Sequence, residues 1–339
     1  MNPAVFASFE TSNCHQGSRP DKHVLRSILA ALAIALSSCL AQAEADSVVI
    51  VVGAAGTPEY GDQFKDWAER WTQVCESSNS LCTVIGTNPI SADRPDRELL
   101  RAAIESHAAG EMPLWLVMIG HGTPFGDGAK FNLRGPDVSS DELAGWLKTV
   151  ERRVAIVNCT SASGPFLKAL SGEKRVVVTA TQSGAEINFA RFGEYFSSAI
   201  SSREADLDHD DQVSLLEAYL TASKNVQRFY DDDDRLATEH ALLDDNGDGQ
   251  GTPTTFFQGI RATKSAKDGS TLDGTVAHHM ILLKSERETA LTTLQVTARD
   301  KLESELELLL SRKSDIPVDD YYGRLETIMI QIAKIYGDR

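Results

Sequence analysis

Basic residues are scarce in this sequence: 33 Lys and Arg stand against 49 Asp and Glu, which gives a formal net charge of −16. A protein with this excess of negative charge repels phosphate backbones, so we do not expect nucleic acid as a partner. Long apolar runs are also missing after Asp46, and nothing there looks transmembrane. What is present, 42% hydrophobic and 24% charged residues over 339 positions, is typical of a globular protein with one large domain plus additions, or with two domains.

The N-terminus resembles an export signal. Basic residues between positions 19 and 26 precede a short apolar run at 28–36, and Ala41-Gln42-Ala43 fits the small-x-small rule for signal peptidase. We therefore expect residues 1–43 to be a signal peptide and the protein to be periplasmic or secreted. The alternative is a lipobox ending at Cys39, which would make the protein a lipoprotein anchored to a membrane.

Cysteine is sparse, with five in the chain, and three of them follow the leader. Cys75 and Cys82 lie close enough in sequence to close a small loop in an oxidising compartment. Cys159 is left over, and a single unpaired thiol in an exported protein is a candidate reactive group.

Short apolar runs alternate with amphipathic stretches over the first half of the mature chain. The runs predict strands at 48–52, 82–85, 114–119, 154–157 and 176–179. The stretches between and after them predict helices at 63–76, 96–109, 140–150, 165–170 and 189–200. This β-α alternation predicts an α/β fold with a mostly parallel sheet covered on both faces, whose chemistry collects at the carboxyl ends of the strands.

The second half of the chain has a different character. Residues 206–255 are acidic loops around a helix, and residues 282–310 have apolar positions at helical spacing. Pro317 breaks that pattern before a further amphipathic helix at 321–336. We expect a C-terminal helical hairpin, or alternatively a coiled segment that binds a protein partner.

His121 and Cys159 each follow an apolar strand directly. If the two strands are neighbours, both side chains emerge at one edge of the sheet. An imidazole can take the proton of a nearby thiol, and the thiolate is a competent nucleophile. Backbone N–H groups at Gly122 and around Cys159 could then stabilise an oxyanion. The other interpretation is a turn histidine and a packed, inert cysteine.

The region from about 48 to 203 resembles the caspase–haemoglobinase fold, and most of all the legumain-like family of cysteine peptidases. The resemblance is carried by Leu116–Gly122, by Phe131-Asn132-Leu133 and by Ala155–Gly164. The run Leu242–Gly249 is similar to bacterial exported proteins of that family with EF-hand-like insertions.

The resemblance implies a three-layer fold and hydrolysis of peptide bonds in a peptide or protein substrate. It makes His121 the general base and Cys159 the nucleophile. The sequence departs from the family pattern after the strand, because aligning on the Ser-Gly pair puts Ser161 at the nucleophile position, and a slip by one puts Thr160 there. Either Cys159 is used with a longer turn after it, or Ser161 takes its place, or the site is degenerate.

The segment Asp206–Glu217 matches the EF-hand calcium loop at nearly every position. The expected ligands are the side chains of Asp206, Asp208, Asp210 and Glu217 and the backbone carbonyl of Gln212. Asp211 stands where glycine is usual, in a position that needs φ > 0. Calcium is therefore the cofactor that we expect; the alternative is a solvated acidic turn that caps a helix.

A second loop begins at Asp244 and offers Asp244, Asn246 and Asp248 as ligands. It lies about as far along the chain from the first loop as paired EF-hands do. Its twelfth position is Thr255 in place of Glu, and Pro253 opposes an exiting helix. A weak or water-completed calcium site and a plain turn are both compatible with this pattern.

These features divide the chain into a signal peptide at 1–43, a legumain-like core at 44–203, an EF-hand-like segment at 204–262 and a helical extension at 263–339. The first hypothesis is an exported cysteine endopeptidase with calcium-binding loops. The alternative is a catalytically inactive caspase-like protein that acts as a calcium-binding or protein-interaction module, with a partner bound through the C-terminal helices.

Overall fold

The computed structural model describes residues 45–89, 94–263 and 272–337. The expected signal peptide and Cys39 lie outside the described residues. The part of the chain from Ala45 onward forms one unit. None of its described helices is both long enough and apolar enough to cross a membrane.

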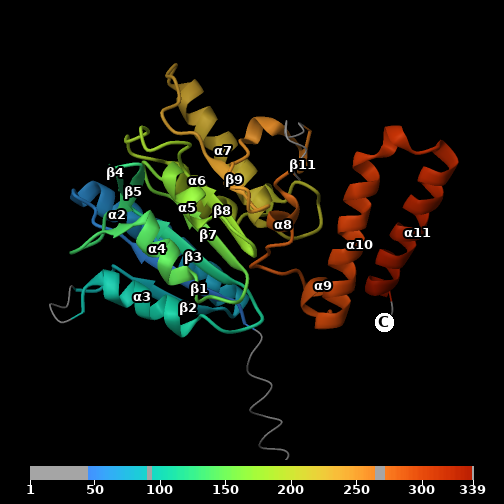
Figure 1. Cartoon of the computed structure of the whole chain (residues 1–339), viewed down its shortest axis with the longest axis horizontal. Coiled ribbons are helices and arrows are strands. Elements are labelled where there is room, and N and C mark those ends of the chain that lie inside the picture. The colour runs from blue at the N-terminus through green and yellow to red at the C-terminus, as the bar shows by residue number, and fades with distance from the viewer. Residues whose placement is uncertain (1–44, 90–93, 264–271, 338–339) are drawn as a thin grey trace, which may run out of the picture. The chain divides into compact units, whose positions relative to one another are not determined.

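A six-stranded sheet runs through the centre of this unit in the order β2-β1-β3-β7-β8-β9 (Figure 1). Its strands are β1 (Ser47–Val52), β2 (Leu81–Ile85), β3 (Leu114–Ile119), β7 (Val154–Asn158), β8 (Arg175–Thr179) and β9 (Leu242–Asp244). All neighbours pair in parallel except β8 and β9, which are antiparallel. The predicted α/β class with a mostly parallel sheet is confirmed.

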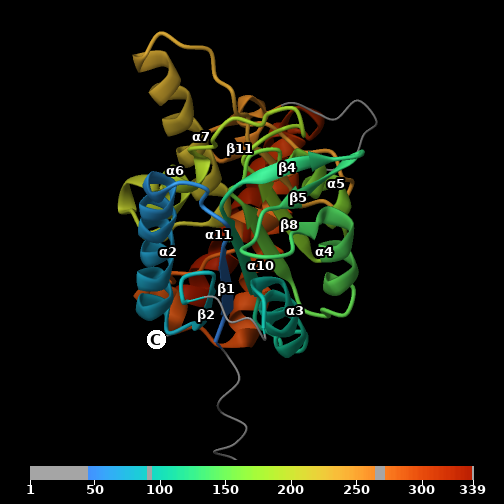
Figure 2. The same cartoon turned by 90° about the vertical axis from the view of Figure 1, so that its left-hand side faces the viewer.

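Helices cover both faces of the sheet, which gives three layers (Figure 2). On one face lie α2 (Pro58–Ser78), α6 (Phe192–Ala199) and α7 (Leu215–Asp232). On the other lie α3 (Asp96–Ser106), α4 (Ser140–Leu147) and α5 (Gly164–Leu170). The expected covering on both faces is therefore confirmed.

Strand periodicity sorts the apolar residues between the two faces. Val117 and Val157 pack under α2, α6 and α7, whereas Leu116 and Ile156 pack under α3, α4 and α5. Because side chains alternate along a strand and both faces are covered, each central strand is continuously apolar.

Two helices begin or end at other residues than predicted. The first helix begins at Pro58, before position 63, because the Thr57 hydroxyl accepts a hydrogen bond from the Tyr60 N–H at 3.5 Å and proline suits the first helical position. The helix expected at 140–150 begins as predicted with a capping box at Ser139 and Glu142, but it ends at Leu147.

A small antiparallel sheet begins directly after His121 and was not predicted. It consists of β4 (Gly122–Phe125), β5 (Gly128–Phe131) and β6 (Val138–Ser139). It pairs Gly122 with Phe131 and thereby fixes the chain that leaves the end of β3.

The acidic segment contributes to the main sheet. It contains the 3-10 helices η1 (Arg203–Ala205) and η2 (Thr254–Phe256), helix α7, strand β9 and the β10–β11 pair (Phe257–Gln258 and Arg261–Ala262). Because β9 pairs with β8, the boundaries at 203 and 262 divide the sequence but not the sheet.

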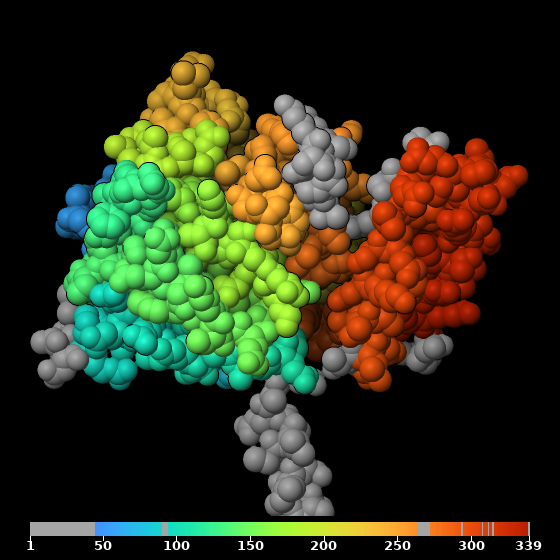
Figure 3. Space-filling model, in the orientation of Figure 1, coloured from blue at the N-terminus to red at the C-terminus, as the bar shows by residue number. Residues whose placement is uncertain are grey.

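The tail forms the expected helical hairpin. Its elements are α8 (Thr275–His278), α9 (Glu286–Thr289), α10 (Thr293–Ser311), η3 (Lys313–Asp315) and α11 (Val318–Gly337). The pattern at 282–310 is two helices, because Thr292 caps α10 through a capping box with Gln295. Leu309, Tyr321 and Ile328 form the core between α10 and α11, which are in contact in the space-filling view (Figure 3).

Candidate functional site

The strands that precede His121 and Cys159 are neighbours, as the dyad hypothesis required. Strand β3 pairs with β7 in parallel, with Met118 opposite Asn158. His121 follows Gly120 beyond the end of β3, and Cys159 directly follows β7. Where the two side chains point then decides whether they can act together.

His121 lies among aromatic side chains at the carboxyl end of the sheet. Its ring centroid is 4.9 Å from that of Tyr60, 5.1 Å from that of Phe64 and 6.0 Å from that of Phe189. Its Nε2 lies 3.1 Å from the carbonyl oxygen of Ala55. Since a carbonyl only accepts, this bond makes Nε2 the donor and leaves Nδ1 with its lone pair in the neutral ring, as a general base requires.

Cys159 points into the core beneath α2 and α6 and is 1% exposed. Its backbone N–H donates to the Met118 carbonyl at 2.9 Å, so it prolongs β7 and shares the face of Val157. A Cβ on Gly193 of α6 would lie 2.8 Å from the Cβ of Cys159 and 2.7 Å from the Trp67 ring. Burial raises the pKa of the Cys159 thiol, and the negative charge of Glu239 adds to this rise. This placement contradicts the expectation of an open groove shared by the Cys159 sulfur and the His121 ring.

The structure instead brings Ser161 to the His-Gly turn. The Gly122 N–H donates to the Ser161 Oγ at 3.2 Å, and the Ser161 hydroxyl lies 3.2 Å from the Gly122 carbonyl oxygen. The Asn158 side chain turns the chain here, because its Oδ1 accepts from the N–H and the hydroxyl of Thr160 at 3.1 and 2.7 Å. Ser161 is 2% exposed. Of the two alternative nucleophiles, Ser161 is hydrogen-bonded to Gly122, whereas the Thr160 hydroxyl donates to Asn158.

Glycine is required at position 122 by this contact. A Cβ there would lie 2.2 Å from the Ser161 carbonyl oxygen and 2.9 Å from the Thr160 hydroxyl. The turn is further defined by Ala162, which has φ +50 and donates its N–H to the Glu186 carbonyl at 2.8 Å. A residue with a Cβ at a positive φ is costly, so the surrounding contacts must hold this turn.

The first acidic loop has the geometry of the calcium-loop hypothesis. Asp206, Asp208 and Asp210 each present a carboxylate oxygen within 4.8 Å of the other two. The N–H groups of Asp210 and Asp211 donate to the two carboxylate oxygens of Asp206 at 3.2 and 3.0 Å. The expected positive φ at Asp211 is found, at +70. Three carboxylate oxygens therefore lie close together in this loop, which is fewer than the six to eight oxygen ligands that calcium takes.

Glu217 lies at the base of this loop and is buried. Its Oε1 accepts from the backbone N–H groups of Leu207 and Asp208 at 2.7 and 3.4 Å. Its Oε2 accepts from the N–H and hydroxyl of Ser214 at 2.8 Å each, which closes the capping box of α7. Burial, together with the negative charges of Asp210 and Glu217, raises the pKa of Asp208 to about 6.

Two contacts connect the loop to the tail. His278 Nε2 lies 3.6 Å from the Asp208 carboxylate. The Gln212 amide donates to Asp210 at 3.0 Å and accepts from the N–H of Ser285, the N-cap of α9, at 3.0 Å. A cavity of about 260 Å³ between the loop and the tail is lined by these groups.

The second acidic loop repeats the turn pattern of the first. Gly247 and Gly249 have φ +79 and +72, and their N–H groups donate to the Asp244 carboxylate at 3.0 Å each. Asn246 and Asp248 accept from the N–H groups two positions further on, at 2.8 and 2.7 Å. The three expected ligands therefore share one loop, although its twelfth position carries no carboxylate.

Sequence reasoning missed Asp273, which does for the second loop what Glu217 does for the first. Its Oδ1 accepts from the N–H groups of Asp245 and Asn246, the second and third loop positions, at 2.8 and 3.1 Å. Its Oδ2 accepts from the Thr252 hydroxyl at 2.6 Å. Burial raises the pKa of Asp273 to about 7. No local spacing signal could have found it, because it lies beyond the loop's twelfth position and outside the motif.

The tail also contains an ion-pair cluster that the sequence did not predict. His279 Nε2 lies 2.9 Å from Glu303, and the Arg299 guanidinium pairs with Glu288, Asp300 and Glu303. His279, Asp300 and Glu303 could together hold a metal by proximity. Arg299 already supplies positive charge to both carboxylates, so the cluster fits an ion-pair network that anchors α10.

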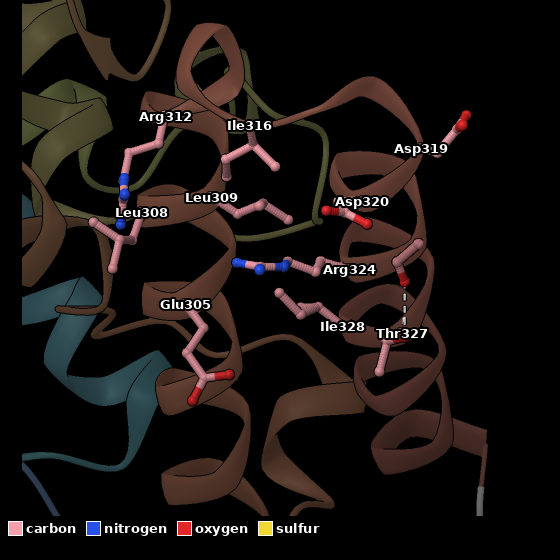
Figure 4. Close-up of a pocket in the computed structure, with 11 residues that line it drawn as sticks. Glu305, Leu308, Leu309, Arg312, Ile316, Asp319, Asp320, Arg324, Thr327 and Ile328 are labelled. Carbon is pink, nitrogen blue, oxygen red and sulfur yellow. Dashed lines mark hydrogen bonds between the residues drawn. The ribbon is translucent and has the colours of Figure 1, made fainter.

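A groove of about 660 Å³ runs between α10 and α11 (Figure 4). Arg324 reaches from α11 towards α10 between Leu309 and Ile328, whereas Asp319 points away. The groove lies in the segment expected to bind a protein partner.

No family model matches the sequence, and no curated protein sequence matches it. Among solved structures, the chain is similar to the Drosophila initiator caspase Dronc at 14% identity and a TM-score of 0.37, over 59% of this chain and 79% of that one. It is also similar to Raptor from Chaetomium thermophilum at 13% identity and a TM-score of 0.32, over 46% of this chain and 17% of that one. These likenesses concern the fold alone.

Proposed function

We propose that this chain is a calcium-binding protein of caspase-like fold and legumain-like type, in which Cys159 is a core residue and not a nucleophile. That Cys159 is not a nucleophile rests on where its side chain points: it is 1% exposed and packs into the core beneath α2 and α6. A buried thiol with a raised pKa is a poor nucleophile.

The donor set of the acidic loops supports the calcium part. Asp206, Asp208 and Asp210 offer carboxylate oxygens that lie within 4.8 Å of one another, and Glu217 adds negative charge at the base of the loop. Hard oxygen ligands at this density suit calcium. A bound calcium ion would offset the mutual repulsion of these carboxylates. In the second loop Asp244, Asn246 and Asp248 would be ligands, with Asp273 in the place of the missing acid.

Calorimetric titration of the chelator-treated protein with calcium tests this proposal. We expect two binding events, of which Asp208→Asn removes the first and Asp248→Asn the second. Asp127→Asn, an exposed acid in the turn between β4 and β5, serves as the matched control. The absence of both binding heat and any change in melting temperature would dismiss calcium.

A second candidate function, a serine-type hydrolase, is favoured by the contact between Ser161 and Gly122. The Gly122 N–H already donates to the Ser161 Oγ, and the Nδ1 of His121 keeps the lone pair that a general base needs. Ser161 is 2% exposed and its hydroxyl donates to the Gly122 carbonyl, so this function requires the turn to open and the hydroxyl to rotate towards His121. Hydroxyls are weak nucleophiles without such a base.

Covalent probes separate the two candidates. Labelling by a fluorophosphonate that is lost in both Ser161→Ala and His121→Ala would support the serine hydrolase, with a peptide or protein as its substrate. Labelling by a thiol-directed peptidyl probe that is lost in Cys159→Ala would restore the cysteine peptidase and overturn our proposal. No labelling by either probe is the expected result for the calcium-binding module.

We also propose export, and a protein partner that binds through α10 and α11. Sequencing the N-terminus of the mature protein distinguishes cleavage after Ala43 from lipidation at Cys39. A start at Met1 in the exporting host would exclude both.

A further inference from the structure

Cys75 and Cys82 are brought together by the turn between α2 and β2. Cys75 lies in the last turns of α2, and Cys82 is the second residue of β2, the edge strand of the sheet. Asn79 caps α2 with φ +53, and the Ser80 N–H donates to the Cys75 carbonyl at 3.0 Å. This tight reversal brings the start of β2 back beside the helix that precedes it.

Cys82 pairs with Val48 of β1, and Val48 shares with Cys75 the core beneath α2, so the Cys82 side chain lies on the face of the sheet that α2 covers. Cys75 is buried in the core beneath α2, whereas Cys82 is exposed at the sheet edge. The neighbouring Cys75 lowers the pKa of the Cys82 thiol, so the accessible thiol is also the one that more readily becomes a thiolate. An exposed thiol that faces a second thiol across one short turn is the arrangement from which a disulfide forms by exchange.

We propose that Cys75 and Cys82 form a disulfide that ties the end of α2 to the edge strand β2. The exchange partner is a disulfide-bearing oxidant, either a small molecule or a protein. The Cys82 thiolate attacks one sulfur of that disulfide, forms a mixed disulfide and releases one thiolate. The Cys75 sulfur then attacks the Cys82 sulfur and releases the second thiolate. Two protein thiols are oxidised, the oxidant disulfide is reduced to two thiols, and the two protons pass to them.

Cys159 provides an internal contrast. It is buried among Trp67, Gly193 and other residues of the same core, and its pKa is raised by burial. We expect it to stay reduced under conditions that oxidise the pair. The disulfide closes only a short loop, over residues 76–81, so its stabilising effect through the unfolded chain is small, an increase of about 3–5 °C in melting temperature.

Peptide mapping of the full chain tests the proposal. The folded protein is incubated with oxidised glutathione, its remaining thiols are alkylated under denaturing conditions, and it is digested with a protease that cuts after glutamate. Cleavage after Glu76 separates the two cysteines, so a disulfide keeps their peptides joined until a reductant is added. We expect the joined pair in the wild type and in Cys159→Ser, and its absence in Cys82→Ser.

Thermal melting of the same samples shows whether each variant is folded, so that a missing disulfide is not mistaken for a misfolded protein. The wild type is expected to melt at a higher temperature after oxidation, and Cys82→Ser, a change at an exposed site, is expected to show no such rise. Alkylation of both Cys75 and Cys82 after incubation would overturn the proposal. A glutathione adduct that persists on Cys82 would overturn it as well, because Cys75 would then have failed to displace it.

Discussion

Replacing Asp208 by asparagine should change the stability of the protein in opposite directions with and without calcium. Without the ion, Asp208 is repelled by Asp206 and Asp210, whose ligand oxygens lie within 4.8 Å. The change keeps the shape of the side chain. This change also disturbs the loop backbone less than a change at Asp206 would. Both oxygens of Asp206 accept backbone hydrogen bonds, whereas Asp208 faces His278 at 3.6 Å.

The size of the effect follows from the spacing. Two unit charges 4.8 Å apart repel by about 0.9 kcal/mol in water, and more in a partly buried setting. Asp208 has two such neighbours, and salt weakens their repulsion while the variant also loses the attraction to His278. We therefore expect Asp208→Asn to raise the free energy of unfolding by about 1–2 kcal/mol. For a chain of this length that gain corresponds to an increase of about 2–4 °C in the melting temperature of the calcium-free protein.

The assay is thermal unfolding in chelator and in excess calcium, for the wild type, Asp208→Asn and the Asp127→Asn control. In chelator, Asp208→Asn should melt above the wild type, and high salt should narrow the difference. In calcium the order should reverse, because the variant lacks one ligand of the first site. A variant that melts lower than the wild type in chelator, or a wild type that ignores calcium, would refute the reasoning.

Three further results are expected. The pKa of Asp208 is raised to about 6, so the folded protein binds a proton at this carboxylate more tightly than the unfolded chain does. This proton binding stabilises the calcium-free protein fully below the unfolded pKa of about 3.9, and the stabilisation is lost as pH rises through about 6. Protons compete for the same carboxylate, and calorimetry should find weaker calcium binding at about pH 5 than at about pH 7.5. Arg299→Met should cost about 3–5 kcal/mol in denaturant unfolding, since buried Glu288 loses its partner, and a second change, Glu288→Gln, should recover part of that loss. Cys159→Ala should cost about 1–2 kcal/mol, and the native Cys159 thiol should resist alkylation until the protein unfolds.

The strands and their pairing were predictable because their signal is local. Six consecutive apolar residues at 114–119 can only be a strand buried on both faces or part of a buried helix, and their length favours the strand. Strand alternation with helices then predicts parallel neighbours, and β3 does pair with β7. The ends of the helices were less predictable, since they depend on single caps such as Thr57.

The direction of Cys159 depended on where β7 stops pairing. A ladder that ends at Val157 would free Cys159 to turn towards His121. The ladder continues, because the Cys159 N–H donates to the Met118 carbonyl, and the period of two then places Cys159 beside Val157 in the core. One backbone hydrogen bond, which the sequence does not reveal, separates the two outcomes.

Asp273 and β9 were missed for another reason. Both act through contacts with residues far away along the chain, which a pattern confined to one loop does not contain. Strand β9 is also only three residues long, which is too short for a periodic signal. The conformation of the first loop was predictable for the opposite reason, because its acidic residues, its positive φ at Asp211 and its terminal Glu217 all lie in one continuous segment.

The contacts of the first loop would connect a calcium ion bound there directly to the C-terminal hairpin. Gln212 joins the Asp210 carboxylate to the start of α9, and His278 faces Asp208. A cation bound by these carboxylates would compete with His278 for Asp208 and would fix the carboxylate to which Gln212 is bonded. Linkage is reciprocal, so if calcium changes how the hairpin docks, then the docked hairpin must change calcium affinity by the same factor. In this arrangement a partner that binds α10 and α11 would also sense the ion, although it touches none of the ligands.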